Sequence, residues 1–447
     1  MHHLSADTQQ ANNNDYLVSK SRAWFAFAMT FALMLFDYID RQVIVSLFPH
    51  LKAAWNLSDK QLGGLVSIIS VVVALGGIPV ALLADRVSRV KSVVVMGVVW
   101  SLATISCMFT RNYSQLFMAR AMVGVGESGY GSVGAALIAS LFPARLRSML
   151  LGAFFAAGSI GAVLGVVLGG VITARWGWQA AFGVVGVPGL LLALLYMFVP
   201  DYKTAALDTR PAHEQRQAKS LFAHMVSALT SSRTLWWTCL GAALQLVVVS
   251  TIWAWLPSYF NRLHGMPVDQ AAMQSALIVL CGAVGCFIWG VVADIAGTKQ
   301  PRNKLKAVSF LCMVTAPILV IAFGAAESMN QQFLLIALGG FLMTCTVGPA
   351  SSVVLDVVHP GLRSTGAALL SLFQNLFGLA IGPFVGGALS DAFGLQAALT
   401  AMPVFGLLAA LCLLRASRTY ERDLQEVAQI QSAIAEQPAG AAASMTA

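Results

Sequence analysis

The sequence predicts an all-α membrane protein whose twelve transmembrane helices form two pseudo-symmetric halves of six. The chain of 447 residues is 58% hydrophobic and only 10% charged, whereas about a quarter of a typical soluble protein is charged. Apolar runs close to the ~20 residues that cross a bilayer recur along the chain. Short motifs of the first half also return in the second half at an offset of about 216 residues, as in repeat architectures.

The apolar runs divide the chain into two halves. A polar tail, 1–21, precedes the first half, 22–199, whose runs are 22–48, 60–84, 92–110, 114–140, 149–174 and 178–199. A basic connector, 200–233, leads to the second half, 234–415, whose runs are 234–260, 270–293, 305–325, 331–356, 364–389 and 395–415. The charged and then Ala-rich tail, 416–447, is expected to be disordered.

Basic residues are distributed unequally between the two sides of these spans. Of 27 Lys and Arg residues, 20 fall on one side, 5 on the other, and 2 (Arg41 and Arg120) inside spans. Because basic residues accumulate in cytoplasmic loops, both termini are expected in the cytoplasm, in a cell (inner) membrane. The first 20 residues lack an apolar core, so no removable signal peptide is expected. The net charge of +8 comes from these loops and does not indicate a nucleic-acid partner.

The motifs that would indicate an enzyme or a nucleotide-driven pump are missing from the sequence. We find no phosphate-binding loop, nucleophile elbow or zinc-binding helix. The seven cysteines fall within apolar runs without metal-ligand spacing, which favours a packing role. The chain is therefore expected to need no metal or cofactor. We also expect it to act as a monomer in the lipid bilayer.

Three charged residues interrupt the first apolar run: Asp37, Asp40 and Arg41. At helical spacing they share one face, and Asp37 can pair with Arg41 one turn away. Charge inside a membrane costs several kcal/mol unless it faces protein or water, so this face must point inward. A structural ion pair needs only one acid. The second acid therefore favours a substrate or proton site over a purely structural pair.

Glu127 is another acid expected near mid-depth, roughly 20 Å along the fourth span at ~1.5 Å per residue. Desolvation there favours a protonated carboxyl, so Glu127 is a candidate proton carrier, with a hydrogen bond to backbone as the alternative role. Arg41 can bind a carboxylate or phosphate, or pair with Asp40. No His lies within a span, so proton transfer would depend on carboxylates.

The second half offers uncharged groups for the same candidate site. Gln245 and Trp253 lie in the seventh run and Asn375 in the eleventh, while Tyr130 follows Glu127 in the fourth. This division suits an amphiphile or aromatic acid whose charge binds the first half and whose body binds the second. The tryptophans can equally belong to an interfacial belt.

Two charged turns and a glycine ladder resemble the major facilitator superfamily, and this resemblance covers residues 22–415. The turn 85–89 reads Asp-Arg-Val-Ser-Arg, and Asp294 lies at the matching point of the second half. The fifth and eleventh runs carry glycines four residues apart, which leave a smooth strip for a neighbouring helix. The resemblance implies that four residues latch the halves on the cytoplasmic side, although topogenic charge alone is the alternative: Asp85, Arg86, Arg89 and Asp294.

Segments 37–42 and 120–130 most resemble the spinster-like group, which carries an Asp-Arg pair in its first helix and Gly-x-Gly-Glu in its fourth. By this resemblance Arg120 anchors the fourth helix against a neighbour's backbone. The implied function is secondary transport by alternating access, coupled to protons as symport or antiport, of a lysolipid-like or other amphiphilic substrate. The Asp-Arg pair also resembles anion:cation symporters, so a proton-coupled symporter of small organic, including aromatic, anions is the alternative. An uncoupled channel or scramblase is a third possible function.

The predicted topology can be tested with two single cysteines. Replacing Gln215 in the connector and Asn112 after the third span should give labelling from opposite sides of the membrane. A membrane-impermeant maleimide applied to sealed cells and to inverted vesicles makes this measurement. Labelling of both positions from the same side would contradict the twelve-span arrangement.

Overall fold

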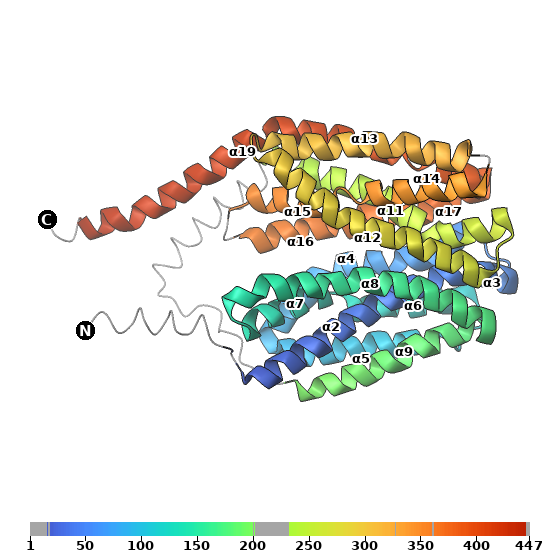
Figure 1. Ribbon diagram of the computed structural model, residues 1–447. Coiled ribbons are helices and arrows are strands. Elements are labelled where there is room, and N and C mark those ends of the chain that lie inside the picture. Colours follow the sequence, from blue (N-terminus) through green and yellow to red (C-terminus); the bar gives the residue numbers. More distant parts are fainter. Residues whose placement is uncertain are drawn as a thin grey trace. The chain divides into compact units, whose positions relative to one another are not determined.

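The computed structural model describes residues 16, 18–199, 201, 232–326, 328–359 and 362–443, and every regular element in these ranges is a helix (Figure 1). Within them, eleven helical stretches are long and apolar enough to cross a membrane. The fourth expected span is made of two shorter helices, α6 (Tyr113–Glu127) and α7 (Tyr130–Leu141), so all twelve predicted spans correspond to helices. Nearly all of the expected tail 1–21 and connector 200–233 lie outside the described residues.

The first half contains, besides α6 and α7, the following elements: α2 (Lys20–Val43), η1 (Ile44–Leu47), α3 (Phe48–Trp55), α4 (Asp59–Val87), α5 (Arg89–Cys107), α8 (Ala144–Trp176), α9 (Trp178–Leu195) and η2 (Tyr196–Phe198). Polar side chains begin several of them. Ser58 and Gln61 form a capping box at α4, and Ser88 and Asn112 accept hydrogen bonds from the first turns of α5 and α6. These caps satisfy backbone N–H groups that a helix leaves free at its start.

The second half contains α11 (Arg233–His264), α12 (Val268–Gly297), α13 (Arg302–Gly324), α14 (Met329–Met343), α15 (Val347–Asp356), α16 (Arg363–Phe373), η4 (Gln374–Leu379), α17 (Ile381–Phe393), α18 (Leu395–Ala401) and α19 (Val404–Ala443). The helix α19 extends well past the expected end of the last span at 415, so the prediction of a disordered tail from 416 is wrong. Asp423 explains part of this extension, because it accepts hydrogen bonds from the Ser232 hydroxyl and the Thr234 amide.

The chain folds into two compact units. Unit 1 comprises Met1–Ala205, Ile252–Leu280 and Pro383–Leu395, and unit 2 comprises Ala206–Thr251, Cys281–Gly382 and Gln396–Ala447. In unit 1, α2, α5, α8 and α9 run side by side (Figure 1). We call the end of unit 1 at which α3 lies and α4 begins the remote end. Because α11, α12 and α17 each pass from one unit to the other, unit 1 also holds segments of the second half.

Both halves contain a broken span at the same place. The break between α6 and α7 falls at Ser128 and Gly129, where Gly129 has a φ of +81° that favours glycine. The break between α14 and α15 begins at Thr344, and 344 − 128 gives the offset of 216 residues found in the sequence. In each case a hydroxyl of the break bonds a carbonyl of a neighbouring span, from Ser128 to Val72 O and from Thr344 to Gly282 O. These breaks, which the apolar pattern does not reveal, belong to the internal repeat.

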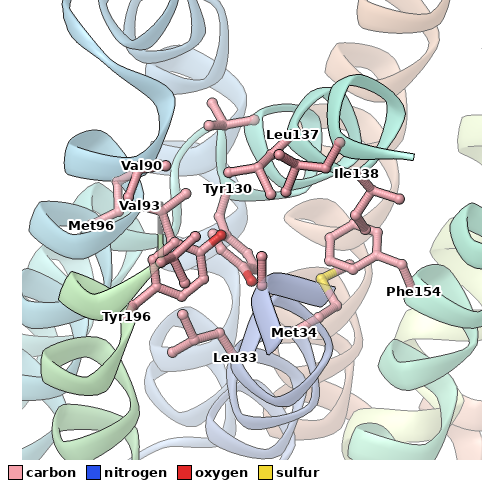
Figure 2. Packing of buried hydrophobic residues seen from close by; sticks show 14 of the residues in the cluster. Leu33, Met34, Val90, Val93, Met96, Tyr130, Leu137, Ile138, Phe154 and Tyr196 are labelled. Carbon is pink, nitrogen blue, oxygen red and sulfur yellow. The ribbon is translucent and has the colours of Figure 1, made fainter. Parts of the chain in front are cut away.

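The buried core of unit 1 surrounds Tyr130 at the start of α7 (Figure 2). The Tyr130 ring lies 5.5 Å from that of Trp100 and 6.2 Å from that of Phe154. Its hydroxyl donates to Thr30 O at 2.7 Å, and the Thr30 hydroxyl lies 2.8 Å from the hydroxyl of Tyr196. The core thus holds α2, α5, α7, α8 and α9 together just beyond the break.

Glycines of α8 let this helix approach the backbone of α2. A Cβ added to Gly161 would lie 2.5 Å from Leu35 O, and one added to Gly169 would lie 2.5 Å from Val43 O. In unit 2, Gly382 lies in the same way against the backbone of α11. The glycine strip predicted from the sequence is therefore the surface on which the first span packs.

We predict that Gly161→Ala destabilises the protein by about 1–3 kcal/mol, because the added methyl group must push α8 away from α2. The matched control is Gly152→Ala in the same helix, where an added Cβ meets nothing within 4 Å. Thermal unfolding in detergent, followed by tryptophan fluorescence, compares the two. Equal midpoints for both variants would show that close packing of α8 on α2 contributes nothing.

Candidate functional site

Five charged residues of α2 and α6 meet inside unit 1. Asp37 and Asp40 are buried, and so are Arg120 and Glu127 of α6. Arg41 is the most accessible charged residue of this group, with 18% of its side chain exposed. The inward orientation predicted for the charged face of the first span is confirmed for both aspartates.

Arg41 lies between two carboxylates. Its Nε is 2.9 Å from Glu127 Oε2 and 3.6 Å from Asp37 Oδ2. The guanidinium carbon also lies 5.6 Å from the centre of the Tyr38 ring. The predicted pair between Asp37 and Arg41 is thus confirmed, and Glu127 joins it from α6. We call these three residues the Arg41 trio.

Asp40 has a different partner from the one predicted, because it pairs with Arg120 and not with Arg41. Arg120 Nη1 lies 3.5 Å from Asp40 Oδ1 and donates to Asp40 O at 3.3 Å. The Thr104 hydroxyl of α5 donates to Asp40 Oδ2 at 2.8 Å. Side chains of adjacent residues in a helix point ~100° apart. The Asp40 side chain therefore points toward α5 and Arg120, while the Arg41 side chain points toward Glu127. The bond from Arg120 to Asp40 O is a contact of the kind that the predicted anchoring on a neighbour's backbone requires, and the anchoring role stays a prediction.

The segment around Glu127 is built for close packing. Glu127 is the last residue of α6, and the Ser128 hydroxyl donates back to Gly124 O at 2.7 Å. A Cβ on Gly126 would lie 2.4 Å from Trp100 N, so only glycine lets α6 lie this close to α5. The Gly-x-Gly-Glu motif therefore delivers a carboxylate to Arg41 at the point where the helix ends.

The cluster has an unbalanced charge and unused hydrogen-bonding atoms. Three carboxylates and two guanidinium groups leave one negative charge when all five are ionised. Among the described residues, Asp37 Oδ1, Asp40 Oδ1, Arg41 Nε, both carboxylate oxygens of Glu127 and the Nε and Nη2 of Arg120 have no hydrogen-bond partner, although Arg41 Nε and Glu127 Oε2 lie at ion-pair distance. Leaving such atoms unpaired costs about 1–3 kcal/mol each. One proton would neutralise the cluster, and a polar ligand could use the free atoms of Asp37 and Glu127.

The remaining predicted site residues take other positions. Tyr130 belongs to the core, with its hydroxyl bonded to backbone. In unit 2, Gln245 is fully buried and donates to Met343 O at the broken tenth span, and Asn375 bonds within its own helix to Ser371. Trp253 of unit 1 has a buried Nε1 that has no hydrogen-bond partner among the described residues. The structure thus brings only the charged residues together, and a ligand-binding role for the other four stays a prediction.

The four residues predicted to form a latch lie at the ends of α4, α5 and α12. Arg89 donates to the Ser140 hydroxyl at 3.0 Å, and Asp294 lies 2.7 Å from Lys304 Nζ. Both contacts stay within one six-span half. The side chains of Asp85 and Arg86 are outside the described part of the structure, so the latch itself stays a prediction.

Two features of the site were missed by sequence reasoning. Thr104, which holds Asp40, lies in an apolar run where nothing marks it as special. The π-helical turn η4 in the eleventh span, which contains Asn375, also has no signal in the apolar pattern. The break after Glu127 had a usable signal, since Ser-Gly in mid-span favours the end of a helix.

The chain is similar in sequence to a family of known proteins and in fold to solved structures. The model of the family described as Major Facilitator Superfamily matches residues 30–380 and 307–444. Protein spinster homolog 3 of Danio rerio is 26% identical over 396 residues, covering 84% of this chain and 78% of the relative. A gallate transporter of Pseudomonas putida is 27% identical over 427 residues, covering 88% and 91%. The chain also resembles the crystal structure of a bacterial homolog of the human lysosomal transporter spinster, in an inward-facing and unoccupied conformation, with a TM-score of 0.82 and 23% identity, over 91% of this chain and 99% of the other.

We predict that Asp40→Asn destabilises the protein by about 3–5 kcal/mol, because it leaves Arg120 as a buried cation without a counter-charge. Asp37→Asn should cost about 1 kcal/mol or less, since Arg41 keeps Glu127 and is partly exposed. Both substitutions preserve side-chain shape and remove one negative charge. Thermal unfolding measures the difference, and equal losses of stability would contradict the pairing of Asp40 with Arg120.

Proposed function

The chain belongs to the major facilitator superfamily, and we propose that it is a proton-coupled secondary transporter that works by alternating access on an amphiphilic solute with an anionic group. It is a multi-pass membrane protein of the spinster type. The observation that supports proton coupling is the Arg41 trio, in which one guanidinium is held by two carboxylates inside an unbalanced charged cluster.

Protonation of the trio would change what Arg41 can bind. While Asp37 and Glu127 are both ionised, they occupy the guanidinium and repel an anionic ligand. A proton on either carboxyl weakens its hold, so that Arg41 can offer its planar fork to a carboxylate or phosphate. Proton binding and anion binding would then favour each other, as linkage requires. This reciprocity makes proton and substrate travel together, which is symport.

Asp40, Arg120 and Thr104 would serve as the fixed part of the site. Arg120 is fully buried, and Asp40 is held from two helices. A charge pair with this burial has no route to an external ligand, and separating it leaves two desolvated charges. We therefore assign it to positioning α2, α5 and α6 so that Arg41 and Glu127 meet.

Two classes of substrate fit this proposal. The first is a lysolipid-like amphiphile whose phosphate binds Arg41, which is the class that the resemblance to the spinster-like group implies. The second is a small aromatic carboxylate, supported by similarity to a gallate transporter over 88% of this chain. Both classes carry an anionic group that Arg41 can bind, and we propose that this group is what the site recognises. The flux and binding assay below distinguishes their apolar parts.

The place of the protein in the cell is also part of the proposal. The unequal distribution of Lys and Arg supports both termini in the cytoplasm of a cell (inner) membrane. With this orientation, the remote end of unit 1 faces the outside. We propose a monomer as the working unit, surrounded by lipid.

We predict that Glu127→Gln reduces transport driven by a pH gradient at least about tenfold while substrate binding survives. The glutamine mimics a permanently protonated carboxyl, so Arg41 stays available, but the proton that resets the cycle cannot leave. Substrate exchange at equal pH on both sides should persist. Flux into proteoliposomes, measured beside equilibrium binding for a lysolipid and for gallate, tests the coupling and separates the two substrate classes.

The matched control is Glu421→Gln, which removes a carboxylate that is 44% exposed and paired with Arg302 in unit 2. It should transport as the unchanged protein does. Full gradient-driven transport by Glu127→Gln would exclude Glu127 from the proton path. If the flux of either substrate through the unchanged protein does not depend on the pH gradient, the protein would instead be a channel or scramblase.

A further inference from the structure

We infer that unit 2 binds the phosphate group of an anionic phospholipid of the surrounding bilayer through three arginines on one side of α19: Arg415, Arg418 and Arg422. We call these residues the arginine face. The lipid would be held on the outside of the protein and would not be a transported solute. The inference therefore does not rest on the proposed function, and it needs only that the chain is a multi-pass membrane protein.

The arginine face continues the surface of α19 that is exposed to lipid within the span. Val404, Leu408 and Leu411 are 51, 44 and 54% exposed. They follow one another at steps of four and three residues, and the same steps lead on to Arg415 and Arg418, so all five lie on one side of the helix.

The spacing along α19 places the arginine face at the level of the lipid headgroups. Arg415 follows Leu411 by four residues, which is ~6 Å along a helix. The headgroup layer on each side of a bilayer is about 5–7 Å thick. A lipid whose acyl chains lie on the exposed leucines would therefore bring its phosphate to the arginines.

The charge of the arginine face is not compensated by the protein. All three arginines are exposed, and in the described part of the chain none of them forms an ion pair. The acids nearby have other partners, since Glu421 lies 3.6 Å from Arg302 and Asp423 accepts hydrogen bonds from the end of the connector and the start of α11. Glu426, one turn after Arg422, is where the basic side of the helix ends. An external anion can therefore bind without displacing an internal one.

Trp237 of α11 lies beneath the arginine face. The guanidinium carbon of Arg415 is 5.2 Å from the centre of the Trp237 ring. Tryptophan is enriched at the boundary between membrane and water, which agrees with the level inferred from α19. A guanidinium held over a ring still offers its N–H groups to two phosphate oxygens. Arg233, one turn before Trp237 on α11, is also exposed and adds a fourth cation.

Hydrogen bonds fix this part of α19 on unit 2. The Thr419 hydroxyl lies 2.7 Å from the Thr234 hydroxyl, and Asp423 Oδ2 accepts the Thr234 amide at 2.9 Å. The Tyr420 hydroxyl donates to Asp356 Oδ2 at 2.7 Å. The arginines are thus carried by an anchored helix, which lowers the entropy lost when a ligand binds. A bound lipid would join the ends of α11 and α19.

Native mass spectrometry of the full-length protein in detergent, with phosphatidylglycerol or phosphatidylcholine added, tests the inference. One phosphatidylglycerol should bind at least about tenfold more tightly than phosphatidylcholine. A basic residue near an anionic lipid strengthens binding about fivefold. Arg418→Gln should therefore weaken phosphatidylglycerol binding about fivefold, and Arg415→Gln combined with Arg418→Gln at least about tenfold. Binding of phosphatidylcholine should stay the same in both variants.

The matched control is Arg302→Gln, which removes a 42% exposed basic residue of unit 2 that is paired with Glu421. It should keep the preference for phosphatidylglycerol. Equal phosphatidylglycerol binding by the double variant and the unchanged protein would overturn the inference.

Inorganic phosphate separates a lipid site from a site for the free anion. Thermal unfolding in detergent should shift upward with phosphatidylglycerol and not with millimolar inorganic phosphate, because only the lipid also covers the exposed leucines. Equal shifts from both would contradict a lipid site. Neither measurement involves transport, so both are independent of the outcome for Glu127→Gln.

Discussion

The charged site depends on the contact between Arg41 and the two carboxylates of Asp37 and Glu127, at 3.6 and 2.9 Å. Charge of this kind is costly inside a membrane and persists only where it is paired. Much of unit 1 serves to bring these groups together. Glycines of α8 fix α2, and Gly126 brings α6 against α5. The break at Ser128 and Gly129 ends α6 at the carboxylate.

The cluster divides into a closed part and an open part. Arg120 and Asp40 neutralise each other in a fully buried setting, with Thr104 as a further donor to Asp40. The Arg41 trio has the surplus carboxylate and the partly exposed guanidinium. A single protonation changes the trio from negative to neutral, which alters its affinity for an anion without disturbing the closed pair.

Periodic features were predictable from the sequence, whereas partners across space were not. Asp37 and Arg41 are one helical turn apart, so their pairing followed from spacing alone, and the glycines of α8 marked a packing surface. The partner of Asp40 depends on how α5 and α6 are rotated about their axes, which apolar runs do not specify. The contact of Thr104 with Asp40 depends on the same tertiary geometry. The extension of α19 was missed because the charged sequence after 415 was interpreted as a disordered tail. The hydrogen bonds that Asp423 accepts from Ser232 and Thr234 cannot be seen in the sequence.

The central claim is that one proton titrates in the Arg41 trio. Infrared difference spectra of the purified protein, recorded while pH is changed, detect the C=O stretch of a protonated buried carboxyl group. We predict a band that corresponds to one proton per chain, and this band should shift or vanish in Asp37→Asn and in Glu127→Gln. A band that stays unchanged in both variants would contradict the claim and place the proton elsewhere in the protein.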